Sequence, residues 1–100
     1  MNLIDKHIAD IQKLCIDYKV RKLYAFGSVL TTEFNIESDI DLLVDFNHIE
    51  LAHYADNYYD FKFSLQNVLN RPIDLLEEKA IRNPYFRQNI NQQRRLIYGH

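Results

Sequence analysis

The sequence predicts a mixed α/β (α+β) domain in which helices flank a small mixed β-sheet. The chain contains two amphipathic stretches with helical spacing and three short apolar stretches typical of strands. The helices are expected at residues 3–18 and 48–70, and the strands at residues 22–26, 39–44 and 73–76. Because 100 residues is an ordinary domain length, residues 1–100 are expected to form one domain.

The composition narrows the classes of protein to which the chain can belong. Its hydrophobic fraction of 47% and charged fraction of 26% are typical of a soluble protein. The net charge of −2, with no basic block, argues against direct nucleic-acid binding, which depends on phosphate neutralisation. Cys15 is the single cysteine, so no intrachain disulfide is possible. No apolar run has the length of a membrane span, and residues 1–10 do not resemble a signal peptide, so we expect a cytoplasmic protein with no membrane contact.

The first helix is predicted by apolar side chains that recur at three- and four-residue steps. These positions are Leu3, Ile4, His7, Ile8, Ile11, Leu14, Cys15 and Tyr18. The chain then turns into the apolar strand at residues 22–26, which ends at Gly27 and Ser28. Gly27 permits a tight turn, and Ser28 supplies a hydroxyl and an N–H. Donors at such a turn form a concavity suited to a phosphate group.

Ten residues separate Ser28 from Asp39. One or two helical turns are expected at residues 29–32, followed by a loop at residues 33–37. Asp39 and Asp41 lie on one face of the next strand, with Cα atoms about 7 Å apart. Carboxylates at that spacing can bind one divalent cation or share a pair of cations. A phosphate-binding turn next to metal-binding carboxylates indicates nucleotide chemistry.

The longest predicted helix, residues 48–70, has two apolar stripes. The first is expected to form core and consists of Leu51, Tyr54, Tyr58, Phe61, Leu65, Val68 and Leu69. The second consists of Ala52, Tyr59 and Phe63. It exceeds what one packing face requires, so it is either more core or a surface for a protein partner.

Asn70, Arg71 and Pro72 end that helix and lead into the third strand at residues 73–76. Asp74 is the acidic position of this strand. If the strand pairs beside residues 39–44, its carboxylate meets those of Asp39 and Asp41 at the end of the sheet. Asn83 and Pro84 then predict the start of a last helix, and residues 96–98 form either a short strand or an extended tail.

The Gly-Ser, ten-residue, Asp-x-Asp spacing resembles the minimal nucleotidyltransferases (MNT) of the DNA polymerase beta-like superfamily. The likeness extends over almost the whole chain. Residues 71–76 resemble the family's third-carboxylate strand, and residues 81–86 and 96–99 resemble the tail of members paired with HEPN toxins. One feature differs, because relatives commonly carry an arginine just after Gly-Ser and residues 29–32 contain none.

The resemblance implies a polymerase beta-like nucleotidyltransferase fold and a role for each acidic residue. Asp39 and Asp41 would bridge two Mg²⁺ ions, and Asp74 would hold the acceptor-side ion and help to deprotonate the acceptor. Gly27 and Ser28 would bind the β- and γ-phosphates of ATP.

The resemblance also implies a partner. The family members that are paired with HEPN toxins act as antitoxins. They transfer AMP from ATP to a tyrosine hydroxyl of the HEPN ribonuclease toxin and form a hetero-oligomer with it. A sequence of 100 residues has few residues with which to enclose a small acceptor. We therefore expect the acceptor to be a protein that docks on the domain. Two alternatives stay open: an antitoxin that neutralises the toxin by direct binding alone, and a small-molecule nucleotidyltransferase completed by a helical partner.

Overall fold

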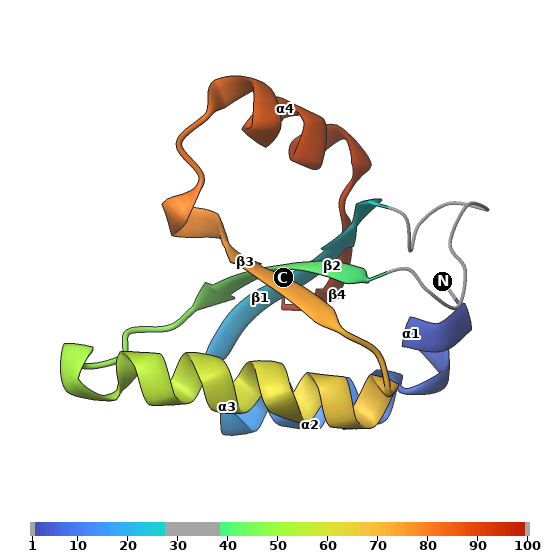
Figure 1. Cartoon of the computed structure of the whole chain (residues 1–100), viewed down its shortest axis with the longest axis vertical. Coiled ribbons are helices and arrows are strands. Elements are labelled where there is room, and N and C mark those ends of the chain that lie inside the picture. Colours follow the sequence, from blue (N-terminus) through green and yellow to red (C-terminus); the bar gives the residue numbers. More distant parts are fainter. Residues whose placement is uncertain (1, 28–38, 100) are drawn as a thin grey trace.

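The molecule is built on a four-stranded mixed sheet with the strand order β3-β2-β1-β4 (Figure 1). The computed structural model describes residues 2–27 and 39–99. Strand β1 (Val20–Phe26) is antiparallel to both β2 (Ile40–Phe46) and β4 (Arg95–Tyr98). Strand β3 (Ile73–Glu77) is parallel to β2. The predicted mixed sheet is therefore confirmed, and the end of the chain forms a short strand on its edge.

The amphipathic stretch at the start of the chain forms two helices where one was expected. Helix α1 spans Asn2–Lys6 and α2 spans Ile8–Asp17, with His7 in a turn between them. The His7 N–H donates to the Ile4 carbonyl at 3.1 Å, while the His7 carbonyl accepts from the Ile11 N–H at 3.0 Å. The break keeps the apolar spacing on both sides, which explains why the sequence pattern does not reveal it.

Helix α3 (Leu51–Leu69) supplies much of the core (Figure 1). Phe61, Leu65 and Leu69 are buried, as the first stripe predicted. The prediction for Leu51 is wrong, because this side chain is 91% exposed in the first turn, which extends beyond the sheet. The second stripe is surface and not core: its members Ala52, Tyr59 and Phe63 are all exposed.

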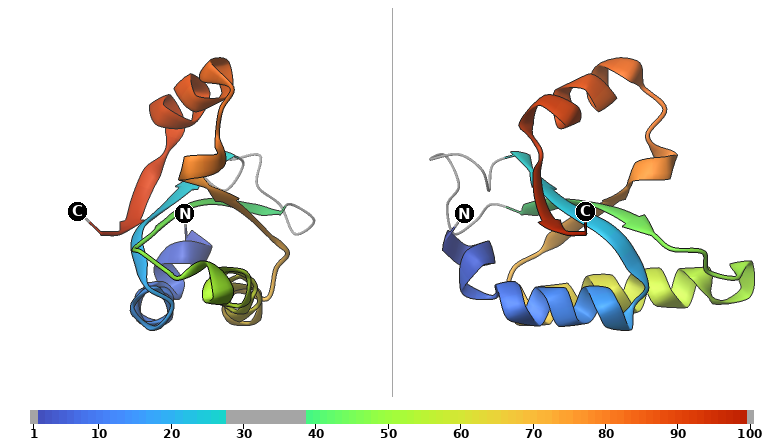
Figure 2. Two further views of the ribbon diagram at one scale, coloured as in Figure 1. Left: turned by 90° about the vertical axis from the view of Figure 1, so that its left-hand side faces the viewer. Right: turned by 180° about the vertical axis from the view of Figure 1, so that it is seen from behind.

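The two faces of the sheet are covered unequally. Helices α2 and α3 lie side by side on one face, and α4 (Pro84–Gln93) lies on the other (Figure 2). The α2/α3 face holds the larger core, while the α4 face has a small cluster centred on Tyr24, Leu43 and Ile90. On the α4 face, parts of β2 and β3 are therefore not covered by apolar side chains.

The start of α4 confirms the predicted cap. The Asn83 side-chain oxygen accepts the Tyr85 N–H at 2.9 Å and the Phe86 N–H at 3.2 Å, and Pro84 occupies the first turn. Between β3 and α4, a short 3-10 helix, η2, spans Glu78–Ala80. Among the helices of the described ranges, none has the length and apolar character needed to cross a membrane.

Candidate active site

Asp41 and Asp74 lie on the same face of the sheet, on neighbouring strands. On β2, Ile40 and Leu42 face the larger core, so the side chain of Asp41 between them faces α4. On β3, Ile73 and Leu75 flank Asp74 in the same way. The parallel register pairs Asp41 with Asp74, which brings the two carboxylates together as the sequence predicted.

Backbone hydrogen bonds fix this register at the starts of the two strands. The Ile40 N–H donates to the Pro72 carbonyl at 3.0 Å. The Ile73 N–H donates to the side-chain oxygen of Gln66 at 3.2 Å, which ties β3 to helix α3. Helix α3 thus ends at Leu69, with Asn70 in the left-handed conformation, and the Pro72 carbonyl takes part in the ladder next to Asp41.

Asp39, just before β2, completes the acidic group. Partial burial raises the pKa of Asp41, and the negative charges of Asp74 and Asp39 raise it further. Asp41 is half-buried, while Asp39 and Asp74 are exposed. Asp39 and Asp74 are therefore both close enough to Asp41 to influence it electrostatically.

Gly27 packs directly against the carboxylate of Asp41. Its φ of +76° is in the left-handed region, which glycine adopts readily. A Cβ at this position would lie 2.5 Å from Oδ2 of Asp41. Only glycine therefore fits without displacing the carboxylate. Ser28, the loop expected at residues 33–37 and the helical turn expected at residues 29–32 lie outside the described residues.

The donor set suits a hard divalent cation, although its side chains are not arranged as a coordination cluster. Within residues 2–27 and 39–99, no three His, Cys, Asp or Glu side chains are grouped closely enough to hold a metal ion. Carboxylate oxygens are nevertheless the ligands that Mg²⁺ prefers, and Asp39, Asp41 and Asp74 are near one another. Binding would require their side chains to rotate toward a common point.

The sequence analysis did not identify an ion pair at the opposite end of β2. Asp45 is buried, and its Oδ2 accepts the Arg21 Nε–H at 2.8 Å and a second bond from an Arg21 terminal nitrogen. The predicted strand ended at Val44, two residues before the end of β2, so Asp45 was not assigned a position. Asp45 lies four residues from Asp41, or about 13 Å along the strand, so this pair is structural and separate from the candidate site.

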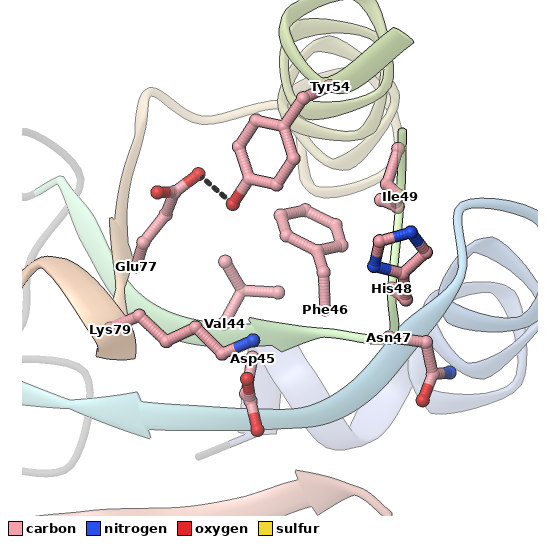
Figure 3. Close-up of a pocket in the computed structure, with 9 residues that line it drawn as sticks. All are labelled: Val44, Asp45, Phe46, Asn47, His48, Ile49, Tyr54, Glu77 and Lys79. Carbon is pink, nitrogen blue, oxygen red and sulfur yellow. Dashed lines mark hydrogen bonds between the residues drawn. The ribbon is translucent and has the colours of Figure 1, made fainter. Parts of the chain in front are cut away.

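A small cavity also lies at this far end (Figure 3). Its volume is about 120 Å³. Tyr54 points across it and donates its hydroxyl hydrogen to Oε1 of Glu77 at 2.5 Å. Burial and the neighbouring carboxylate of Glu77 raise the pKa of Tyr54, so its hydroxyl stays protonated as the donor. Neither Asp41 nor Asp74 lines this cavity.

A second cavity, which the sequence analysis missed, adjoins the candidate site. It lies between α4 and the end of β1, and Gly27 forms part of its wall. Helix α4 contributes Phe86, Asn89 and Gln93. Their three- and four-residue spacing was the available signal, but two exposed amides on a polar helix do not stand out in a sequence.

Comparisons with known proteins find relatives by sequence and by structure. Residues 9–100 match the profile of a protein family described as "Polymerase beta, Nucleotidyltransferase". The chain is 35% identical over 81 residues to "Putative protein adenylyltransferase MJ1379" of Methanocaldococcus jannaschii, which covers 81% of this chain and 78% of that protein.

Solved structures show the same fold at lower identity. One, described as a "putative minimal nucleotidyltransferase", superposes with a TM-score of 0.77 at 23% identity, over 92% of this chain and 90% of that chain. Another is a complex of tri-AMPylated Shewanella oneidensis HEPN toxin with MNT antitoxin. A chain of it superposes with a TM-score of 0.66 at 20% identity, over 96% of this chain and 72% of that chain. The expected fold is confirmed.

Proposed function

Because the chain belongs to the polymerase beta nucleotidyltransferase family, we propose that it is a protein adenylyltransferase antitoxin. Its reaction transfers AMP from ATP to a tyrosine hydroxyl of a HEPN ribonuclease toxin. Two findings support the choice of reaction and partner: the name of the relative at 35% identity, and the AMPylated HEPN complex among the structures of the same fold.

The pairing of Asp41 with Asp74 is the observation that carries the proposal. Like charges on directly opposed residues of a sheet are destabilising, so this arrangement has no structural advantage. A catalytic site that binds cations gives the two carboxylates a function on that face.

The residues have distinct roles in the transfer. The hydroxyl oxygen of the acceptor tyrosine attacks the α-phosphorus of ATP, the bond to the β-phosphate oxygen breaks, and pyrophosphate leaves. Asp74 accepts the hydroxyl proton, and Asp39 and Asp41 would hold the divalent cations. Two Mg²⁺ ions, when bound, would lower the pKa of the hydroxyl and neutralise the leaving group. Gly27 and Ser28 orient the β- and γ-phosphates with backbone donors.

The exposed aromatic pair on α3 provides a surface for the partner. Tyr59 and Phe63 are 53% and 54% exposed, and their rings stack with centroids 6.3 Å apart. Aromatic side chains of this kind are enriched in protein interfaces. Helix α3 covers the face of the sheet opposite to α4 (Figure 2). Asp74 faces α4, because its neighbours Ile73 and Leu75 face the larger core, so docking and catalysis use different surfaces of the molecule.

A second candidate function is neutralisation of the toxin by contact alone. The exposed Tyr59 and Phe63 favour it, as does the lack of an arginine at residues 29–32, directly after Gly-Ser. In that case the acidic site is a remnant of the fold and the aromatic pair carries the activity.

Nucleotide binding distinguishes the two. A ligand that binds only the folded state raises its stability, by about 2.7 kcal/mol at one hundred times the Kd. Mg²⁺ with ATP at millimolar concentration should therefore raise the melting temperature by several degrees. A melting temperature that does not change with ATP and Mg²⁺ would favour neutralisation by contact.

A further inference from the structure

A cavity of about 160 Å³ lies between helix α4 and the end of β1. Its size is below the roughly 300–1,000 Å³ of pockets that enclose a drug-sized ligand. It therefore has room for one flat ring system and not for a whole nucleotide. Its lining consists of Phe26, Gly27, Phe86, Asn89, Ile90 and Gln93.

One face of α4 forms most of the cavity wall. Phe86, Asn89, Ile90 and Gln93 follow one another at steps of three, one and three residues, which places them on a common helical face. Ile90 is buried against Tyr24 and Leu43 and anchors the helix on the sheet. Phe86 therefore offers an aromatic surface, while Asn89 and Gln93 offer amide donors and acceptors.

Polar contacts hold α4 in this position. A terminal nitrogen of Arg87 donates to the Glu78 carbonyl at 2.7 Å, and Nη1 of Arg94 donates to Oε1 of Glu78 at 3.1 Å. The Arg94 guanidinium also lies 4.2 Å from the ring centroid of Tyr24, within cation–π range. The wall of the cavity is thus preorganised relative to the sheet.

The cavity adjoins the candidate catalytic carboxylates. Phe26 is the register partner of Asp41, and antiparallel partners have Cα atoms about 5 Å apart with side chains on one face. Gly27 lines the cavity and at the same time contacts the Asp41 carboxylate. A ring in the cavity would therefore lie close to the Asp41 carboxylate.

We infer that this cavity binds the adenine base of ATP, an inference that rests on the proposed adenylyl transfer. Phe86 provides a stacking surface, and base–aromatic stacking is largely independent of the base. Asn89 and Gln93 supply specificity, because a carboxamide pairs with one donor and one acceptor on the edge of adenine. The ring of an acceptor tyrosine has no such edge and would leave both amides unused.

The test measures the affinity of the full chain for ATP, GTP and tripolyphosphate in the presence of Mg²⁺. In N89A/Q93A, we expect ATP affinity to fall roughly 10-fold and the preference for ATP over GTP to shrink, with tripolyphosphate affinity unchanged. The matched control Q88A/N91A removes one glutamine and one asparagine that are exposed on the same helix outside the cavity. It should bind all three ligands as the parent does.

The outcomes separate this inference from the proposed function. If the parent binds ATP and N89A/Q93A retains both its affinity and its preference, the base site is wrong and the proposed transfer stands. Equal affinity of the parent for ATP and GTP would also contradict the base site, as would a loss confined to the affinity for a tyrosine acceptor. If the parent binds neither ATP nor tripolyphosphate, the proposed function and the base site fail together.

Discussion

Asp41 and Asp74 are register partners on adjacent parallel strands, and both side chains face α4. Parallel neighbours in a sheet are about 4.8 Å apart, so two carboxylates in this position repel each other unless positive charge lies between them. The arrangement lowers stability when no cation is bound, and a bound cation would relieve the repulsion between the two carboxylates. The predictions below follow from this relationship and from the surfaces around it.

The first prediction concerns stability and pH in the metal-free protein. The raised pKa of Asp41 means that, above its ordinary value of 3.8, the folded state binds more protons than the unfolded state. The free energy of unfolding of the parent therefore falls as pH rises from 3.8 through the pKa of the folded state. Asp41→Asn stays neutral, so above this window it should be more stable than the parent, by about 0.5 kcal/mol.

Urea unfolding in the presence of a chelator, between pH 3.5 and 7, measures this difference. The advantage of Asp41→Asn should shrink as pH falls from the pKa of Asp41 in the folded state toward 3.8. Asp10→Asn, which removes an exposed carboxylate from α2, serves as the control. A constant gap between Asp41→Asn and the parent across this range would show that repulsion at Asp41 does not affect stability.

The second prediction concerns the glycine that contacts Asp41. Gly27→Ala places a Cβ in a left-handed backbone and against the Asp41 carboxylate, so it should cost about 1–2 kcal/mol in backbone strain alone. It should also abolish the rise in melting temperature produced by ATP and Mg²⁺, because the carboxylate is displaced.

Gly99→Ala is the matched control for that experiment. Gly99 also has a positive φ, of +98°, and a Cβ there would lie 2.3 Å from the Arg21 carbonyl oxygen, on β1. It should therefore lose stability and keep the response to ATP and Mg²⁺. Equal responses of the two variants would contradict a role for Gly27 in the nucleotide site.

The third prediction concerns the aromatic pair on α3. The double variant Tyr59→Ala, Phe63→Ala should change the free energy of unfolding by less than about 1 kcal/mol, because both side chains are half exposed. It should weaken capture of the HEPN partner in a pull-down. Leu96→Ala removes another exposed apolar side chain, on β4, and should capture the partner normally. Unchanged capture by the double variant would exclude the pair from the interface.

The sequence predicts the three central strands well, because local signals specify them. The Asp-x-Asp spacing predicts one face for Asp39 and Asp41, but β2 begins at Ile40, so Asp39 lies just outside the strand. Pro72 directly precedes the strand that carries Asp74. The register that pairs Asp41 with Asp74 depends on tertiary contacts such as the one between Ile73 and Gln66. The sequence alone therefore allowed the pairing of these two strands but did not specify their register.

Other features depend on where the elements end in three dimensions. Leu51 continues the apolar periodicity of α3, yet the sheet does not extend beneath the first turn, so its side chain is exposed. The break at His7 preserves the helical spacing, and the cavity beside Gly27 forms only when α4 packs over β1. The spacing of apolar residues predicts which face of a helix is apolar, but it does not predict which element packs against that face.

AMP transfer by Asp74→Asn tests the central claim most directly. The substitution keeps the shape of the side chain but removes a carboxylate that binds metal and accepts a proton. Loss of general-base help alone lowers a rate roughly 10²–10⁴-fold, while binding through Tyr59 and Phe63 should persist. The measurement is mass spectrometry of a HEPN partner after co-expression, together with a pull-down and an assay of toxin activity. We predict that the parent adds AMP to the partner and silences it, whereas Asp74→Asn binds the partner but neither modifies nor silences it. If Asp74→Asn silences the toxin as well as the parent does, with AMP found in neither case, the chain acts by contact and the adenylyl transfer account is wrong.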